Sequence, residues 1–196
     1  MVDEFSSFAR MRKPAKSRGD LRETVRDAAF MQSVANPEIE VTADVPDAPV
    51  HAVYDARLVG QALTNVVKNA TEAVSARSGD DLPKGRVKVQ LRGEVNEGSG
   101  RIVIDVIDNG IGLPEEKQKP AARTLHDHAG KKGTGLGLAI VRKILEDHGG
   151  RDRIARRPPK STPEDTGTLV RLALAANAES EPETEDQDQA VIAHGV

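Results

Sequence analysis

Three glycines alternate along the segment GKKGTGLGLAIV, at Gly133, Gly135 and Gly137, and an apolar helical pattern follows them. Glycines at every second position let backbone N–H groups turn toward one point, and a helix N-terminus adds partial positive charge there. The spacing G-x-G-x-G differs from the G-x-G-x-x-G of dinucleotide-binding loops, and the sequence has no G-x-x-x-x-G-K-[ST] loop. We therefore interpret the segment as a cradle for phosphate groups. The simpler alternative is a flexible hinge before a helix.

A second chemical feature is the loop in DVIDNGIGLP, where Asp108 ends an apolar strand. A carboxylate at a strand end can accept a hydrogen bond from an exocyclic amine such as N6 of adenine. Gly110 and Gly112 leave room for a flat ligand to approach the backbone. An Asp-Asn-Gly turn also forms without any ligand, so the loop alone leaves both interpretations open.

A third feature is a polar helix face in LTNVVKNATEAV. Asn65, Lys68, Asn69 and Glu72 fall together on this face because residues three and four apart are neighbours on a helix. Amide oxygens suit a hard cation such as Mg²⁺, and an ammonium group suits phosphates. A solvated helix face without a ligand is the alternative.

These residues need elements that bring them together. Asp20 and Asp55 are suited to cap helices over 21–33 and about 56–77. A third helix is predicted from the glycines to His148, where a charged imidazole would interact favourably with the helix dipole. Strands are predicted at 39–45, 48–54, 85–93, 100–108 and 167–174, the first two as one hairpin-like unit. This order predicts an α+β fold, a two-layer α/β sandwich with helices on one face of a mixed sheet.

Composition limits the classes of protein that fit. The 196 residues include no cysteine, only 2% aromatic residues and no apolar run of membrane-spanning length. The tail, residues 176–196, holds six acids and no Lys or Arg, so the remainder carries 28 basic against 31 − 6 = 25 acidic residues. We expect the tail to be disordered. The basic residues between Arg10 and Arg26 lack interleaved aromatics, so we expect no nucleic-acid binding and no direct membrane contact.

The three features together resemble the ATP-binding domain shared by sensor histidine kinases, gyrase-type topoisomerases, Hsp90 chaperones and mismatch-repair clamps. NVVKNATEAV resembles the asparagine box, DNGIGLP the first glycine box, GTGLGLAIV the second, and GTLVRLAL the closing strand. Within this group of proteins, the motif GTGLGLAIV…HGG is similar to the corresponding segment of histidine kinases. MVDEFSSFARMRKP resembles the end of the dimerisation hairpin in nitrogen-regulation sensor kinases. The resemblance covers about residues 1–174.

The resemblance implies a role for each matching residue. Asn69 would ligate the Mg²⁺ that bridges the ATP phosphates, Asn65 would support it, and Lys68 would contact phosphate. Asp108 would read adenine. The other implied ATP-binding residues are Gly110, Gly112, Gly133, Thr134, Gly135, Leu136, Gly137 and Thr168.

The resemblance also implies boundaries and partners. Residues 1–14 would end the dimerisation hairpin, 15–20 form a linker, 21–175 the catalytic ATP-binding domain, and 176–196 the acidic tail. None of the five histidines lies at the family's phosphoacceptor position. The acceptor histidine would therefore belong to a separate domain, and the phosphate would pass on to a response regulator. We expect a homodimer in the full-length protein and a cytoplasmic location, and the resemblance implies a membrane anchor before Met1.

Two segments depart from the family pattern. Segment 118–132 lacks the Glu-Pro-[Phe/Tyr]-x-Thr motif, and 151–160 (RDRIARRPPK) has no strand periodicity. A hypothesis that explains both is a shifted reading frame, which can encode Glu-Pro-Tyr in the first segment and an alternating strand in the second. Gene bases that cannot encode Glu-Pro-Tyr in that frame would contradict it. If the reading frame is not shifted, we predict a disordered lid, a damaged edge strand and weakened ATP binding.

Two other functions remain open from the sequence. A gyrase-like or chaperone-like ATPase of the same fold would need a glutamate as general base, and Glu72 lies a turn beyond the expected position. A degenerate module would bind nucleotide or a partner domain without transferring phosphate.

Overall fold

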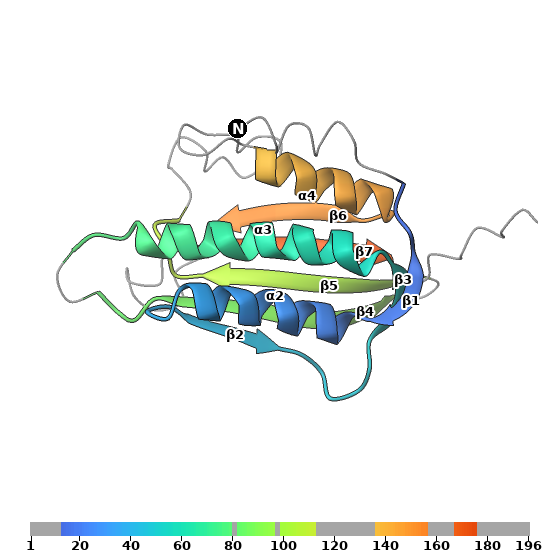
Figure 1. Ribbon diagram of the computed structural model, residues 1–196, viewed down its shortest axis with the longest axis horizontal. Coiled ribbons are helices and arrows are strands. Elements are labelled where there is room, and N and C mark those ends of the chain that lie inside the picture. The colour runs from blue at the N-terminus through green and yellow to red at the C-terminus, as the bar shows by residue number, and fades with distance from the viewer. Residues whose placement is uncertain (1–12, 80–81, 97–98, 113–135, 157–166, 176–196) are drawn as a thin grey trace, which may run out of the picture.

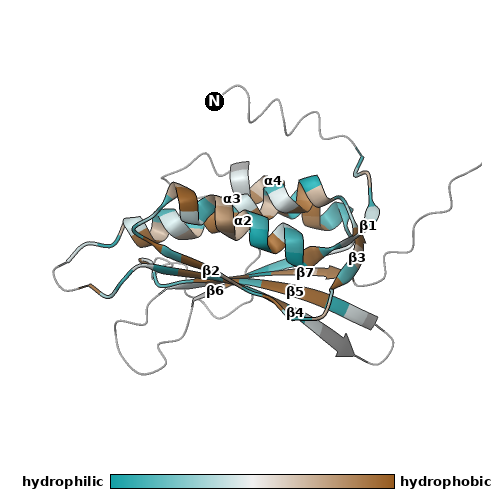
Figure 2. Cartoon of the chain, turned by 60° about the horizontal axis from the view of Figure 1, so that its bottom comes forward, coloured by the Kyte–Doolittle hydropathy of each residue, from teal (hydrophilic) through white to brown (hydrophobic). Residues whose placement is uncertain are grey.

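Three helices cover one face of a five-stranded sheet in the computed structural model, which describes residues 13–79, 82–96, 99–112, 136–156 and 167–175 (Figure 1). The sheet lies beneath the helices as a second layer (Figure 2). This arrangement confirms the expected two-layer α+β sandwich. Among the described residues, no helix is both long and apolar enough to cross a membrane.

The sheet is mixed. Its strands, in spatial order, are β2 (Glu40–Asp44), β4 (Arg86–Asn96), β5 (Ser99–Asp108), β7 (Thr168–Ala175) and β6 (Arg151–Arg156). β2 pairs with β4 in parallel, and the other three pairs are antiparallel. Because β5 ends where β7 begins, Asp108 and Thr168 come to the same edge of the sheet.

The helices begin at capping aspartates. Asp20 accepts a hydrogen bond from the backbone N–H of Arg22 at the start of α2 (Leu21–Ala35), and Asp55 accepts one from Leu58 at the start of α3 (Ala56–Ser75). Such caps satisfy N–H groups that have no partner within the helix. The third helix is α4, Leu136–Asp147.

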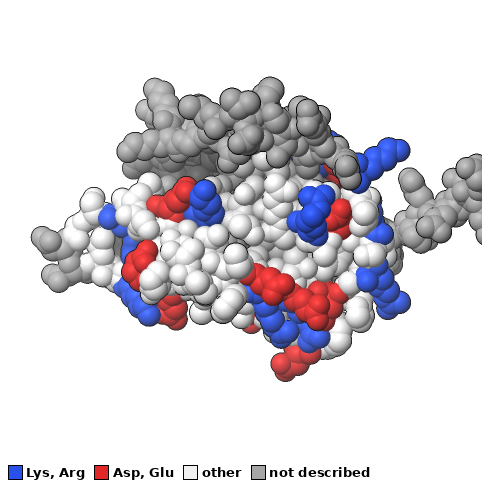
Figure 3. Space-filling model, viewed as in Figure 1, with Lys and Arg blue, Asp and Glu red and all other residues white. Residues whose placement is uncertain are grey.

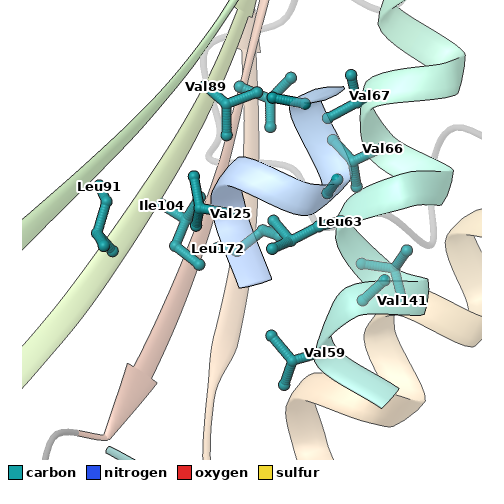
Figure 4. Packing of buried hydrophobic residues seen from close by; sticks show 14 of the residues in the cluster. Val25, Val59, Leu63, Val66, Val67, Val89, Leu91, Ile104, Val141 and Leu172 are labelled. Atoms are coloured by element: carbon teal, nitrogen blue, oxygen red, sulfur yellow. The ribbon is translucent and has the colours of Figure 1, made fainter. Parts of the chain in front are cut away.

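The core lies between the helices and the sheet, and it is built from aliphatic side chains. Leu63 of α3, Val25 of α2, and Ile104 of β5 are fully buried, and Leu172 of β7 is 2% exposed (Figure 4). Full burial of one such side chain stabilises the fold by about 1.5–3 kcal/mol. The packing holds α3 between α2 and α4 (Figure 1).

The predicted hairpin-like unit of 39–45 and 48–54 is wrong. β2 joins β4 instead, and β3 (His51–Tyr54) pairs with β1 (Ser17–Asp20) in a separate two-stranded sheet. Pro46 and Pro49 stand between the two segments and cannot donate the N–H bonds of a hairpin ladder. Part of the segment expected as a linker, 15–20, is thus strand β1.

The prediction of a damaged edge strand after His148 is also wrong. Arg151–Arg156 form β6, which pairs with β7 along its whole length. Ile154 is 6% exposed and stands opposite Val170, so one apolar residue anchors the strand to the core. An edge strand needs a partner on one side only, and the paired prolines Pro158 and Pro159 follow after it. The predicted lid, 118–132, lies outside the described residues.

Candidate nucleotide site

Asp108 is the centre of the candidate site. Its side chain is 3% exposed, and its Oδ1 accepts hydrogen bonds from the backbone N–H groups of Gly110, at 2.8 Å, and Thr168, at 3.1 Å. The first bond closes the loop after β5, and the second ties that loop to the start of β7. The carboxylate is therefore fixed in orientation at the edge of the sheet.

Two glycines let the backbone segments around Asp108 approach closely. A Cβ on Gly110 would lie 2.6 Å from the carbonyl carbon of Ala73 in α3, and the N–H of Ile111 donates to the Ala73 carbonyl oxygen at 3.1 Å. A Cβ on Gly167 would lie 2.0 Å from the Asp108 carbonyl oxygen, and Gly167 has φ +157°. Neither position tolerates a larger residue without movement of the backbone.

Asn109 anchors the loop after β5 through its side chain, a role that the sequence interpretation missed. Its side chain is 6% exposed, its Oδ1 accepts from the N–H of Arg86 at 2.7 Å, and its Nδ2 donates to the Lys84 carbonyl at 2.9 Å. These bonds join the loop after β5 to the start of β4. The only signal for this role in the sequence was an asparagine within a turn motif.

The polar face of α3 carries the second group of candidate residues. Lys68 and Asn69 are exposed and Asn65 is half-buried, whereas Val66 and Val67 on the opposite face pack into the core. Lys68 Nζ lies 3.9 Å from Glu72 Oε1. Both of these side chains are more than half exposed, so the pair contributes little to stability and leaves Lys68 able to turn to a ligand.

The start of α4 lies level with this part of α3. His148, just after α4, contacts Asp55 at the start of α3, and the two helices pack side by side in opposite directions (Figure 1). At about 1.5 Å per residue, the twelve residues back from His148 bring Leu136 level with about residue 67 of α3. The N-terminus of α4 therefore lies level with the part of α3 that carries Lys68 and Asn69.

Gly137 has open space around it. A Cβ there would meet no described atom within 4 Å, so packing among the described residues does not require glycine. Gly112 has φ +71°, a left-handed conformation that favours glycine, and its Cβ would lie 3.5 Å from Gly167. Gly133, Thr134 and Gly135 lie outside the described residues.

His148 has a different role from the one expected. Its ring is 3% exposed, its Nε2 accepts from the backbone N–H of Asp55 at 3.0 Å, and its Nδ1 lies 2.6 Å from the Ile144 carbonyl oxygen. This pattern requires a neutral ring with its proton on Nδ1. His148 therefore fastens α4 to the start of α3 through hydrogen bonds, and it does not act as a cation at the helix dipole.

The described geometry is that of a two-layer nucleotide-binding domain. It unites an acid-glycine loop, a strand beginning with Gly-Thr and an amide-bearing helix face. A family model described as "Histidine kinase-, DNA gyrase B-, and HSP90-like ATPase" matches residues 54–178. Since the match covers more than half of the chain, the chain belongs to this family of ATP-binding domains.

Individual relatives narrow the class. The chain is 45% identical over 178 residues to the nitrogen regulation protein NtrY of Azorhizobium caulinodans, a match that covers 90% of this chain and 21% of that protein. The chain thus spans about a fifth of the length of this relative. The expected class, the catalytic ATP-binding domain of a sensor histidine kinase, is confirmed, and the chain is similar to the nitrogen-regulation protein NtrY.

Solved structures agree in fold. The mycobacterial sensor histidine kinase MprB is 25% identical, with a TM-score of 0.63 over 82% of this chain and 97% of that one. Full-length ShkA in complex with AMPPNP is 22% identical, with a TM-score of 0.70 over 91% of this chain and 36% of that one. The second likeness concerns the fold alone.

Proposed function

We propose that this domain binds ATP with Mg²⁺ and transfers the γ-phosphoryl group to a histidine on a separate acceptor domain, from which the phosphate passes to an aspartate of a response regulator. The observation that carries this proposal is the fixed, buried carboxylate of Asp108, which shares one edge of the sheet with the Gly-Thr start of β7. The family match and the position of Asn69 on the part of α3 that is level with the start of α4 support it.

The adenine end of the ligand is assigned to Asp108. The two backbone bonds to its Oδ1 hold the carboxylate in one orientation, as recognition of an exocyclic amine requires. Gly112 and Thr168 would lie beside the purine, and Gly110 would keep the loop against α3. The close approach of Gly110 to Ala73 supports this assignment because any side chain there would push the loop outward.

The metal would be held by an amide. Asn69 would supply an oxygen to Mg²⁺, Asn65 would support it, and the remaining ligands would come from phosphates and water, as Mg²⁺ prefers. The donor set fits, because an amide oxygen is a hard donor of the kind that Mg²⁺ binds. When bound, Mg²⁺ would neutralise charge on the phosphates during transfer.

The phosphates would lie between α3 and the start of α4. Lys68 would contact them from α3, and backbone N–H groups of Gly133, Thr134, Gly135, Leu136 and Gly137 would face them. The open space at Gly137 supports this assignment, since packing among the described residues gives no other reason for glycine there. The helix N-terminus adds partial positive charge.

The acceptor histidine is assigned to another domain. Of the two described histidines, His148 is buried and uses both ring nitrogens, and His51 lies in β3, which pairs with β1. A homodimer of the full-length protein would bring the acceptor hairpin to this domain.

Mixing this chain with a separately produced histidine-bearing hairpin domain and γ-labelled ATP tests the proposal. Label on the hairpin histidine, lost when that histidine is replaced, is the expected result. Bound nucleotide without labelled histidine would favour the degenerate module. Steady hydrolysis without the hairpin would favour a clamp-type ATPase, although Glu72 lies in a surface pair with Lys68.

A further inference from the structure

A hollow opens where β7 ends. Its volume is about 240 Å³, and Ala173 and Ala175 line it together with two charged residues, Arg101 and Arg151. Arg101 stands opposite Ala175 on β5, and Arg151 stands opposite Ala173 on β6. The small alanine side chains therefore lie between two arginines, one from each neighbouring strand.

The arginines lie on the face of the sheet away from the helices. Leu172 and Leu174 point into the core, so the alternate residues of β7 and their cross-strand partners point outward. Arg153, two residues after Arg151 on β6, shares this face because it stands opposite Arg171. The hollow is thus bordered by basic groups on one side of the sheet.

These arginines differ in pairing from their neighbours. Arg171 and Arg92 both bond to the fully buried carboxylate of Asp105. Arg101, Arg151 and Arg153 are exposed, and within the described part of the chain they form no ion pair or hydrogen bond through their side chains. Three positive charges at this end of the sheet are therefore available to an anionic partner.

The helix face does not share this imbalance. On the helix face, acidic and basic groups stand next to one another (Figure 3). At the hollow, the register places one acid, Glu94 of β4, opposite Arg101. The three arginines outnumber it, and Arg151 and Arg153 lie two strands farther across the sheet.

The chain itself carries a matching anionic segment. Residues 176–196 follow directly after Ala175 and contain no Lys or Arg. Their acids are Glu179, Glu181, Glu183, Glu185, Asp186 and Asp188. Extended chain spans up to about 3.3–3.6 Å per residue, so Glu179 can lie up to about 13 Å from Ala175. Neighbouring strands are about 4.8 Å apart, which brings both flanking arginines within reach.

We propose that the acidic segment 179–188 folds back over the hollow and pairs with the exposed side chains of Arg101, Arg151 and Arg153. The tail would screen these arginines from other acidic molecules. Because Thr168 and Ala175 stand at opposite ends of β7, the contact between tail and arginines leaves the nucleotide site open. The proposed contact does not depend on the proposed function.

A spin label on the tail tests this contact in the full chain. The protein has no cysteine, so Ser180→Cys gives a single attachment point for a nitroxide. The expected result is a selective loss of amide signal at Arg101, Arg151 and Ala173, while α2 keeps its signal. The loss should disappear in about 1 M NaCl, where the Debye length is about 3 Å.

Matched variants separate this contact from general attraction. Replacing Arg101, Arg151 and Arg153 by Gln should abolish the selective loss, and so should replacing the six tail acids by amides. Replacing the exposed Lys16, Arg18 and Arg26 by Gln, the same change in net charge, should leave it intact. ATP affinity should be the same in all these variants.

Other outcomes would overturn the proposal. A loss spread evenly over the domain, or one that survives the arginine replacements, would mean that the tail has no site here. A loss that fades on dilution would assign the face to a second copy of the chain. Binding of poly-glutamate at the arginines without any effect of the tail label would assign it to a separate acidic partner.

Discussion

At the scale of single residues, the fold constrains Asp108 more than its motif suggests. One oxygen of its carboxylate accepts hydrogen bonds from two backbone N–H groups, one in the loop after β5 and one at the start of β7. A change at this residue therefore acts on ligand recognition and on the joint between the loop after β5 and β7. An experiment on Asp108 must separate these effects.

We predict that Asp108→Asn lowers ATP affinity by about 10- to 100-fold, the equivalent of one charge-assisted hydrogen bond. The ATP/GTP affinity ratio should fall as well, because the carboxylate reads the adenine amine. Nucleotide titration measures both, and thermal unfolding checks the fold. Asp27→Asn, the same change on the exposed face of α2, is the control. An unchanged ATP/GTP ratio in a folded variant would remove Asp108 from base recognition.

His148 offers a second test at this scale. Replacing it by Ala leaves the buried N–H of Asp55 without its acceptor and opens a cavity between α3 and α4. We expect a loss of about 2–4 kcal/mol in the free energy of unfolding. Denaturant unfolding measures it. His51→Ala, at an exposed position, is the control, and equal losses in both variants would argue against the role of His148 as a fastening residue.

At the scale of elements, the start of α3 is tied to distant parts of the chain. Asp55 caps it through Leu58, and its Oδ2 accepts from the N–H of Ala15 at 2.9 Å. Burial acts to raise the pKa of Asp55, but the N–H donors of Leu58 and Ala15 and the nearby charge of Arg57 outweigh burial, so the pKa lies below its ordinary value of 3.8.

The sign of this shift predicts acid sensitivity. A carboxyl group with a lowered pKa in the folded state adds stability above its unfolded pKa, and that stability is lost as pH falls through the folded pKa. Asp55→Asn keeps a capping side chain but cannot titrate. We expect the difference in unfolding free energy between the native chain and this variant to shrink as pH falls from 7 to below 3.8. A pH-independent difference in urea unfolding would contradict this expectation.

Helices could be predicted from sequence better than strand pairing. The caps Asp20 and Asp55 indicated where α2 and α3 begin, and the polar face of α3 indicated which side stays out of the core. The partner of β2 could not be predicted, because alternation shows which residues face inward and not which strand lies alongside. Strand β6 could not be predicted from a sequence pattern, because main-chain pairing with β7 and one buried isoleucine stabilise it.

The candidate site could be predicted in part. Asp108, the glycines and the amide face were visible because their residue types carry the chemistry. The supports were not visible. Asn109, the Ala73 carbonyl and His148 act through backbone contacts between distant segments, which no local pattern encodes.

At the scale of the whole molecule, the sheet separates two regions. Asp108, Thr168 and the end of α3 meet at one edge, whereas β7 ends at the other, beside Arg101 and Arg151 (Figure 1). Between the two edges, Asp105 links β5 to both neighbouring strands through Arg92 and Arg171. The candidate nucleotide site is therefore built on a sheet that is held together across its centre.

The central claim, that α3 and the loop after β5 form one site for ATP with Mg²⁺, is tested most directly by ATP affinity with and without Mg²⁺. We predict that Mg²⁺ tightens binding to the native chain and to Asn36→Ala, an amide removal at the end of α2. In Asn69→Ala, affinity should no longer respond to Mg²⁺. An Asn69→Ala variant that is folded and retains the full response to Mg²⁺ would contradict the account.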